Sequence, residues 1–316
     1  MSRYLSFPQR AEQSLLKEYR KRIWRPFMKA IRQYELIQPN DRIAVCISGG
    51  KDSMLMAKLM QILQRHSEVP FEATYLIMDP GYNEINRRKV ESNAKLLGIP
   101  YTLFESDIFE IANSQERNPC FLCAKMRRGC LYNKARELGC NKIALGHHFN
   151  DVIETTVIGM LYGGQLQGMM PKLHSRNFPG MELIRPLYMV HEEDIIAWKN
   201  THELSFIQCA CRFTENCTMC DNGGGGSKRQ EIKQLLKRLN RENCKVEQNI
   251  FNSIHMLQMD TMPGWKKDGV EHTFLEWYYQ LLSWSPDYRR FQLKSNIHMT
   301  ALDKARDKCD NRASKE

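Results

Sequence analysis

Apolar residues recur at steps of three and four over residues 8–35, which predicts an N-terminal helix. The stripe consists of Leu15, Leu16, Tyr19, Ile23, Phe27, Ile31 and Tyr34. Lysine and arginine occupy the other face. Such a face is either simply solvated or turned toward RNA, and the sequence leaves both alternatives open.

Strand-like and helix-like segments alternate after this helix. Short apolar runs predict strands at 43–47, 71–78, 101–104, 142–146, 182–186 and 206–207. Helical periodicity follows Ser53 and recurs at 83–97, 124–138, 149–162, 192–202, 229–239 and 246–257. This alternation predicts an α/β fold with a doubly wound parallel sheet, an N-terminal helix and a C-terminal helical extension.

The same pattern divides the chain into four expected segments. They are a basic N-terminal helix (1–36), the α/β domain (37–208), a cysteine cluster with a helical C-terminal region (209–290) and a tail (291–316). Residues after about 295 lack sustained apolar periodicity, so we expect disorder there.

The first predicted strand ends in a short glycine turn, Ser48-Gly49-Gly50-Lys51-Asp52-Ser53. A turn between a buried strand and a helix exposes backbone N–H groups at the positive end of that helix, where phosphate binds well. Lys51 adds a point charge for phosphate oxygens. An ordinary strand–helix turn is the structural alternative. No segment fits the Gly-x-x-x-x-Gly-Lys-Ser/Thr loop of kinases and GTPases.

Two more loops should lie beside this turn. In doubly wound sheets, ligands bind beyond the carboxyl ends of the strands. Residues 48–53, 79–82 and 146–151 all follow predicted strands, so we expect them in one crevice that forms an ATP site. The alternative for His147, His148 and Asp151 is a structural role at a strand end, where one of them caps the next helix.

Charge and composition narrow the range of partners. The chain has 46 basic and 36 acidic residues and a net charge of +10, which favours a polyanion such as nucleic acid, although a merely basic enzyme is the alternative. The sequence contains no uncharged apolar run of membrane-spanning length and no secretory signal pattern at its start, so we expect a cytoplasmic protein without a membrane segment.

Eleven cysteines without an export signal indicate metal binding or redox chemistry. Cys120 and Cys123 form a Cys-x-x-Cys pair before a helix, which suits a metal or a thioredoxin-like redox pair. The position in the middle of a nucleotide-binding sheet disfavours the redox pair. A second set could hold structural zinc and contains Cys209, Cys211, Cys217 and Cys220.

The glycine turn resembles the signature of the PP-loop, or N-type, ATP pyrophosphatases, which share the adenine nucleotide alpha hydrolase-like fold. Residues 20–240 further resemble one branch, the bacterial tRNA 2-thiocytidine synthetases, which sulfurate the cytidine at position 32 of certain tRNAs. The resemblance rests mainly on Ser48–Ser53, on the stretch Pro119–Tyr132 and on Lys142–His148. It implies adenylylation of the substrate rather than phosphoryl transfer.

The resemblance also implies roles for particular residues. Those implied to bind ATP are Ser48, Gly49, Gly50, Lys51, Asp52, Ser53, Asp79, Gly146 and His147. Those implied to act in catalysis are Lys51, Asp52 and Asp151. Three cysteines of this family bind a [4Fe–4S] cluster, and Cys120 and Cys123 match two of them.

The third cluster ligand does not match cleanly, because this chain has an insertion between Cys211 and Cys217. Cys209 is our prediction, since a strand end fixes a ligand better than a flexible segment; Cys211 and Cys217 are the alternatives. The insertion leaves room for a separate zinc. Clusters usually have four thiolates, so three leave one iron open for an exogenous sulfide.

The function implied by this resemblance is ATP-dependent thiolation of a tRNA cytidine, with Mg²⁺ at the phosphates and sulfur delivered through the cluster. The expected partners are tRNA and a sulfur donor, either a cysteine desulfurase or free sulfide. The sequence does not fix the oligomeric state, and a homodimer is one alternative. Two other functions stay open: a PP-loop sulfurtransferase for another RNA base or a small molecule, and a zinc-stabilised nucleic-acid-binding protein with a vestigial ATP site.

Overall fold

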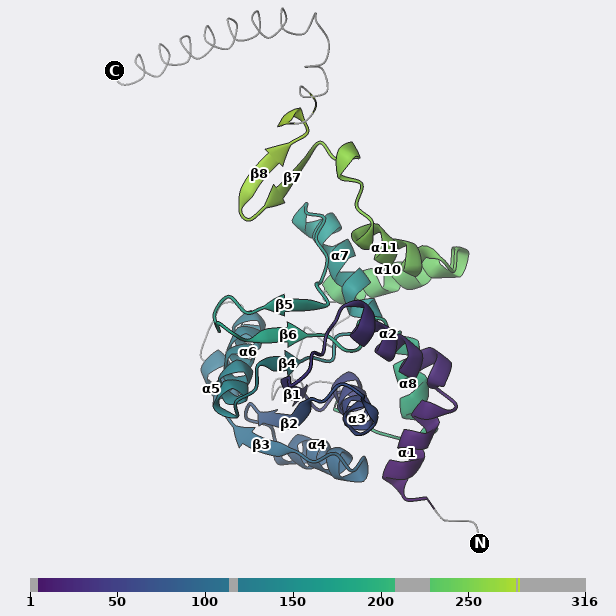
Figure 1. Ribbon diagram of the computed structural model, residues 1–316, viewed down its shortest axis with the longest axis vertical. Helices are drawn as coiled ribbons and strands as arrows, with labels where there is room; N and C mark the ends of the chain where they lie inside the picture. Colours follow the sequence, from purple (N-terminus) through teal and green to yellow (C-terminus); the bar gives the residue numbers. More distant parts are fainter. Residues whose placement is uncertain (1–4, 114–118, 208–227, 277, 279–316) are drawn as a thin grey trace, which may run out of the picture. The chain divides into compact units, whose positions relative to one another are not determined.

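The structure is a computed structural model that describes residues 5–113, 119–207, 228–276 and 278 (Figure 1). The chain forms two compact units, residues 1–254 and 255–316. The described part of the second unit contains a short 3₁₀ turn and a two-stranded antiparallel sheet, β7 (Gly264–Lys267) and β8 (Val270–Thr273). None of the described helices is long and apolar enough to cross a membrane.

A six-stranded sheet forms the centre of the first unit, in the order β3-β2-β1-β4-β6-β5. The strands are β1 (Arg42–Ile47), β2 (Glu72–Asp79), β3 (Thr102–Glu105), β4 (Lys142–Ala144), β5 (Lys172–His174) and β6 (Glu182–Ile184). The predicted doubly wound α/β fold is confirmed, with two differences. The edge strand β5, which was not expected, pairs antiparallel with β6, and residues 206–207 are not in a strand.

Helices cover both faces of this sheet (Figure 1). They are α1 (Phe7–Leu16), α2 (Arg25–Gln33), α3 (Lys51–His66), α4 (Glu84–Leu96), α5 (Ile108–Asn113), α6 (Pro119–Glu137), α7 (Phe149–Gly163), α8 (Glu192–Thr201), α10 (Lys228–Glu242) and α11 (Val246–His255). The positions expected for α4, α7, α8, α10 and α11 are confirmed to within a few residues, and α6 begins five residues earlier than expected.

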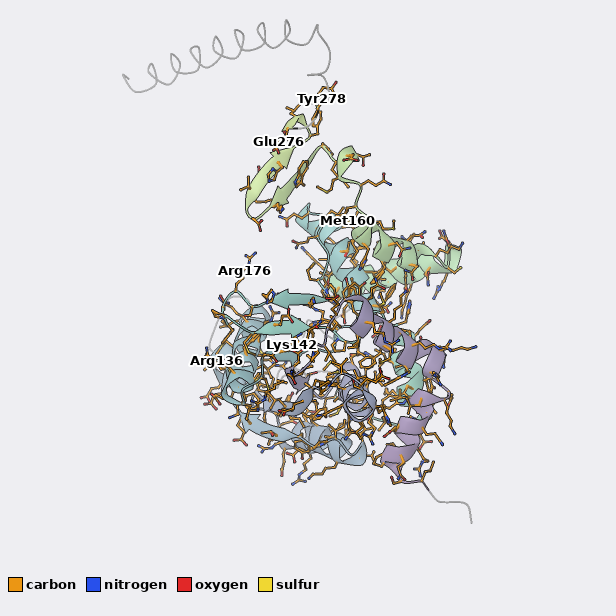
Figure 2. All side chains as sticks on the ribbon, viewed as in Figure 1. Arg136, Lys142, Met160, Arg176, Glu276 and Tyr278 are labelled. Carbon is orange, nitrogen blue, oxygen red and sulfur yellow. The ribbon has the colours of Figure 1, made fainter. Side chains whose placement is uncertain are left out.

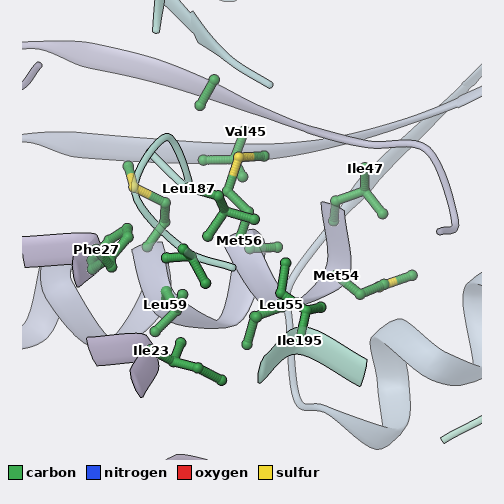
Figure 3. Packing of buried hydrophobic residues seen from close by; sticks show 14 of the residues in the cluster. Ile23, Phe27, Val45, Ile47, Met54, Leu55, Met56, Leu59, Leu187 and Ile195 are labelled. Carbon is green, nitrogen blue, oxygen red and sulfur yellow. The ribbon is translucent and has the colours of Figure 1, made fainter. Parts of the chain in front are cut away.

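The alternation of side chains along β1 builds two cores. Val45 and Ile47 belong to the larger core with residues of α3, α8 and the N-terminal segment, and Figure 3 shows these side chains packed around Leu55 and Leu59. Ala44 and Cys46 belong to the smaller core, where Tyr132 and Ala135 of α6 cover the opposite face. The sheet is therefore buried on both sides, as its apolar strands require.

The N-terminal segment buries the apolar stripe that the sequence predicts, but it is not one continuous helix. A π-helical turn, Arg20–Trp24, joins α1 to α2. The hydroxyl groups of Tyr19 and Thr201 lie 2.6 Å apart, and the Trp198 indole N–H donates to Ser14 Oγ at 3.1 Å, which ties the segment to α8. The segment is thus part of the first unit. The functional borders expected after residues 36, 208 and 290 stay predictions.

A buried lysine, Lys142, lies at the amino ends of the strands, opposite the loops described above as candidate ligand-binding loops. Lys142 Nζ lies 2.8 Å from Asp41 Oδ2 and 2.9 Å from Glu182 Oε2, and it donates to the Leu36 carbonyl at 3.1 Å. Figure 2 shows Lys142 at the sheet, whereas Arg136 projects outward. This cluster joins β4 and β6 to the chain that enters β1, and it lies at the end of the strands where ligands do not bind.

Candidate active site

The strand order reverses between β1 and β4, which pair directly. At such a reversal the two connecting loops part and leave a crevice at the carboxyl ends of the strands. A cavity of about 370 Å³ lies there. Its polar side chains come from the loop after β1, from α6 and from the loop after β4, and they are Ser48, Asp52, Ser53, Arg127, Arg128, His147 and Asp151.

Residues Ser48–Ser53, here called the phosphate loop, turn from β1 into α3. Gly49 has φ +83°, and a Cβ there would lie 2.5 Å from Val90 Cγ2 and 2.7 Å from Ile207 Cδ1. Gly50 is extended and precedes the first residue of α3. A side chain at position 49 would thus be both strained and blocked, so the tight turn requires glycine.

The Ser53 hydroxyl fastens this loop from inside. It accepts hydrogen bonds from the Ser48 N–H at 3.1 Å and the Ser48 hydroxyl at 3.2 Å, and it donates to the Gly50 carbonyl at 3.0 Å. Gly146 closes the other side, because a Cβ there would lie 3.0 Å from the backbone nitrogen of Ser53. The loops after β1 and β4 therefore touch through backbone.

Lys51 is held between two carboxylates. Its Nζ lies 3.2 Å from Asp52 Oδ2 and 3.0 Å from Glu192 Oε1, and the second oxygen of Glu192 lies 2.5 Å from Lys233 Nζ. Burial lowers the pKa of Lys51, but the two carboxylates outweigh it and raise that pKa above its usual value. Burial raises the pKa of Glu192, but the two lysines more than reverse this and leave it at about 2.

His148 joins the phosphate loop to the start of α7. Its backbone N–H donates to Asp151 Oδ2 at 3.0 Å and its Nδ1 accepts from the Asp151 N–H, so the pair caps the helix as the structural alternative predicted. His148 Nε2 also lies 3.7 Å from Asp52 Oδ1. That Asp52 oxygen is buried and has no hydrogen-bond partner among the described residues.

His147 lies on the wall of the cavity as a neutral imidazole. Burial, together with the positive charge of Arg185, lowers its pKa to about 4. Its Nδ1 is buried without a hydrogen-bond partner in the described part of the chain, as is Nε of Arg185. Burial and the nearby Arg128 lower the pKa of Arg185 to about 10. His147 thus presents an unpaired ring nitrogen to a cavity whose lining cations are Arg127 and Arg128.

Asp79 stabilises the turn after β2, residues 79–82. One carboxylate oxygen accepts from the backbone N–H groups of Gly81 and Tyr82 at 2.9 and 2.6 Å, and the other lies 3.4 Å from Arg87. Tyr82 in turn donates to the Ser48 carbonyl at 3.2 Å. Asp79 does not line the cavity, so its contact with the phosphate loop runs through this turn.

Helix α10 is clamped onto the site by charge. Arg229 lies 2.9 Å from Asp151 Oδ1 and 3.1 Å from Glu154 Oε2, and Lys233 reaches Glu192 one turn later. Arg229 and Lys233 of α10 are therefore neutralised by contacts inside the molecule.

The cysteines are only partly described. Cys123 is half-buried in the first turns of α6, the helix that carries Tyr132 of the smaller core. Cys120 lies in the same helix, three residues earlier. Cys209, Cys211, Cys217 and Cys220 lie outside the described residues. Within the described ranges, no three His, Cys, Asp or Glu side chains are grouped to hold a metal.

The structure brings the predicted loops together and adds residues that sequence reasoning missed. They are Arg127, Arg128, Arg185, Glu192, Arg229 and Lys233. The adjacent pair Arg127-Arg128, one turn after the Cys-x-x-Cys, was the available signal. The contacts of the others depend on tertiary packing, so their place at this site could not be predicted.

Comparison with known proteins identifies the family. The family model described as "PP-loop domain" matches residues 19–212. A tRNA-cytidine(32) 2-sulfurtransferase of Anaeromyxobacter dehalogenans is 32% identical over 76% of this chain and 82% of its own length. The corresponding protein of Vibrio cholerae is 36% identical over 72% and 71%.

Solved structures agree with the fold. The U34-tRNA thiolase NcsA from Methanococcus maripaludis, solved with its [4Fe–4S] cluster, aligns with a TM-score of 0.59 and 20% identity over 81% of this chain and 82% of the other. At 20% identity this similarity supports the fold assignment alone. The sequence relatives carry the finer assignment: the chain belongs to the PP-loop family, in the branch of the tRNA-cytidine(32) 2-sulfurtransferases.

Proposed function

We propose that this protein is an ATP-dependent tRNA sulfurtransferase that converts a tRNA cytidine to 2-thiocytidine. The observation that carries the proposal is the cavity at the β1/β4 reversal. There a glycine phosphate loop faces two arginines of α6, the same helix that holds Cys120 and Cys123. Family membership and this juxtaposition of nucleotide chemistry with thiols support the same reaction.

In the proposed reaction the phosphate-loop amides hold the β- and γ-phosphates of ATP at the positive end of α3. Lys51 exchanges a carboxylate for a phosphate oxygen. The C2 oxygen of the cytidine attacks the α-phosphorus, the bond to the bridging oxygen breaks, and pyrophosphate leaves. Arg127 and Arg128 are placed to stabilise the negative charge that develops in this step.

Mg²⁺ fits the free oxygen of Asp52, because carboxylate oxygen is its preferred protein ligand and this atom is buried without a hydrogen-bond partner in the described structure. Asp151 faces the same cavity and would complete or orient this set. The metal would offset phosphate charge. The neutral imidazole of His147 can donate or accept a hydrogen bond at the nucleotide or the base.

The Cys-x-x-Cys spacing of Cys120 and Cys123 in α6 fits a [4Fe–4S] cluster, whose usual ligands are cysteine thiolates. Cys120, Cys123 and Cys209 would hold it, and Cys209 stays a prediction. When bound with three protein ligands, such a cluster supplies an open iron for sulfide. Sulfur then replaces the oxygen at C2, and AMP departs with that oxygen.

The proposed partners follow from this chemistry. Exposed cations of the N-terminal segment and of α10 hold the phosphates of tRNA, and a cysteine desulfurase or free sulfide donates sulfur. A homodimer stays an untested alternative. Because the proposed substrate is tRNA, we place the reaction in the cytoplasm.

The test is a reaction with defined components. Anaerobically purified protein is incubated with ATP, Mg²⁺, sulfide and tRNA from cells that lack it, and digested nucleosides are analysed by mass spectrometry. We expect 2-thiocytidine and pyrophosphate in equal amounts. Another thionucleoside would redirect the proposal to a different base. Release of pyrophosphate without any thionucleoside would reject tRNA thiolation.

A further inference from the structure

A second cleft, of about 370 Å³, lies between the N-terminal segment and the helices α7, α8 and α11, and is here called the basic cleft. Its cationic side chains are Lys21, Arg25 and Lys29. The spacing of four residues places them along one edge of the π-helical turn and α2. The remaining lining residues are Pro26, Phe149, Met189, His191, Gln248 and Phe251.

The three cations of the basic cleft have no acidic partner within the described part of the chain. All three are exposed, and no ion pair connects them to an acidic side chain within the described residues. Arg22 between them, in contrast, lies 3.3 Å from Asp194. Three positive charges aligned on one wall without counter-ions suit a ligand with several negative charges.

The floor of the basic cleft is aromatic. The imidazole of His191 stacks on the ring of Phe149 with centroids 4.1 Å apart, and Phe251 stacks on Phe149 at 4.8 Å. Phe149 and Phe251 are buried, so the half-buried His191 presents this stack to the cleft, beside the amide of Gln248. A flat ring backed by a second ring, next to an amide, suits a nucleobase.

We infer that the basic cleft binds a single-stranded nucleotide of the RNA substrate, with its phosphate on Lys21, Arg25 and Lys29 and its base against His191. The volume suits one nucleotide rather than a duplex. The cleft also borders the active site, since Glu192 holds Lys51 and Phe149 follows the capping His148. This inference rests on the proposed function, because it takes RNA as the substrate.

The test compares two triple variants with equal loss of charge. K21Q/R25Q/K29Q removes the cations of the basic cleft. K17Q/R20Q/R32Q removes three exposed cations from the same segment that do not line it. Binding of an anticodon stem–loop RNA is measured over a range of salt concentrations. We expect the cleft variant to lose about 10–100-fold affinity and to lower the salt slope by about 0.7–0.9, which is the contribution of the one phosphate that the three cations contact.

Equal losses in both variants would overturn the inference, because they would show diffuse attraction without a site. Unchanged ATP affinity serves as the control for folding. His191→Ala should weaken the stem–loop about 5-fold and leave binding of a blunt RNA duplex unchanged, and an equal effect on both RNAs would overturn the stacked base. If wild-type protein binds no tRNA, the proposed function fails; if it thiolates tRNA and the cleft variant binds normally, only this inference fails.

Discussion

At the scale of single residues, the site is defined by charges that neutralise each other before any substrate arrives. Glu192 holds Lys51 and Lys233 at once, and its pKa is about 2. Removing its charge would leave two ammonium groups facing each other. The neighbouring Glu193 is exposed and offers a matched control.

Glu192→Gln should therefore lower the free energy of unfolding by about 1–3 kcal/mol at pH 7. Because the folded-state pKa is depressed below 4.5, the stabilisation by the carboxylate is present above that pH and is lost as the pH falls toward 2. Urea unfolding of wild type, Glu192→Gln and Glu193→Gln at pH 7 and pH 3 measures this. A Glu193→Gln loss as large as that of Glu192→Gln would contradict the assignment.

We predict that burial of His147 makes the free energy of unfolding depend on pH in the neutral to acidic range. Its folded-state pKa of about 4 lies below the ordinary 6.5, so the unfolded chain takes up the proton first as the pH falls. Stability should decrease from pH 6.5 to pH 4 by about 3 kcal/mol from this residue, and the decrease should be complete below pH 4.

In His147→Gln this contribution should vanish, which flattens the curve of unfolding free energy against pH between 4 and 6.5. Substitution of the exposed His174 is the control. The measurement is urea unfolding at half-unit pH steps. An unchanged curve in His147→Gln would show that His147 is not buried as a neutral group.

At the scale of elements, the strand–turn–helix unit from β1 to α3 is specified locally. Gly49 needs its positive φ and its missing side chain, whereas a Cβ at Gly50 would have its nearest neighbour, Ser48 Oγ, at 3.8 Å. Substituting each of the two adjacent glycines by alanine therefore distinguishes a position that requires glycine from one that only tolerates it.

We predict that Gly49→Ala lowers the unfolding free energy by at least about 2 kcal/mol and abolishes ATP binding. Gly50→Ala should stay within about 1 kcal/mol of wild type. Thermal unfolding and titration with an ATP analogue measure both effects. Equal destabilisation by the two substitutions would refute the steric argument.

The sequence predicted these elements because each depends on a short pattern. The phosphate loop and the His148–Asp151 cap are set by residues within six positions of one another. The contact between Lys51 and Glu192 spans 141 positions and depends on which strands become neighbours, so no local pattern encodes it. The strand β5 was missed for a related reason: Lys172–His174 is three residues long and mostly polar, and its pairing with β6 alone makes it a strand.

At the scale of the whole molecule, the proposed iron–sulfur cluster would connect parts of the chain far apart in sequence. Cys120 and Cys123 stand at the start of α6, and the predicted third ligand Cys209 precedes α10. Cysteines bind an iron–sulfur cluster as thiolates arranged by the folded chain. Removing one of these ligands should therefore lower the amount of cluster that the protein retains.

Cys123→Ser should remove most iron and the visible absorption of anaerobically reconstituted protein. Cys130→Ser, a free cysteine of the same helix, should retain both. Cys209→Ala should behave like Cys123→Ser, and Cys217→Ala like wild type. Iron analysis and absorption spectra measure this, and the reverse result for Cys209 and Cys217 would move the third ligand to Cys217.

The carboxylate of Glu192 gives the site an internal substitute for phosphate. In the proposed reaction, Lys51 would not be left without a counter-ion when pyrophosphate leaves, because Glu192 and Asp52 can pair with it again. The affinity for pyrophosphate would be reduced by the strength of the contact of Lys51 with these carboxylates. Inorganic phosphate or sulfate would have to compete with the same contact. A phosphate loop whose lysine is paired in the free protein would release pyrophosphate more readily than one whose lysine is unpaired. The latter would be inhibited by the product of its own reaction.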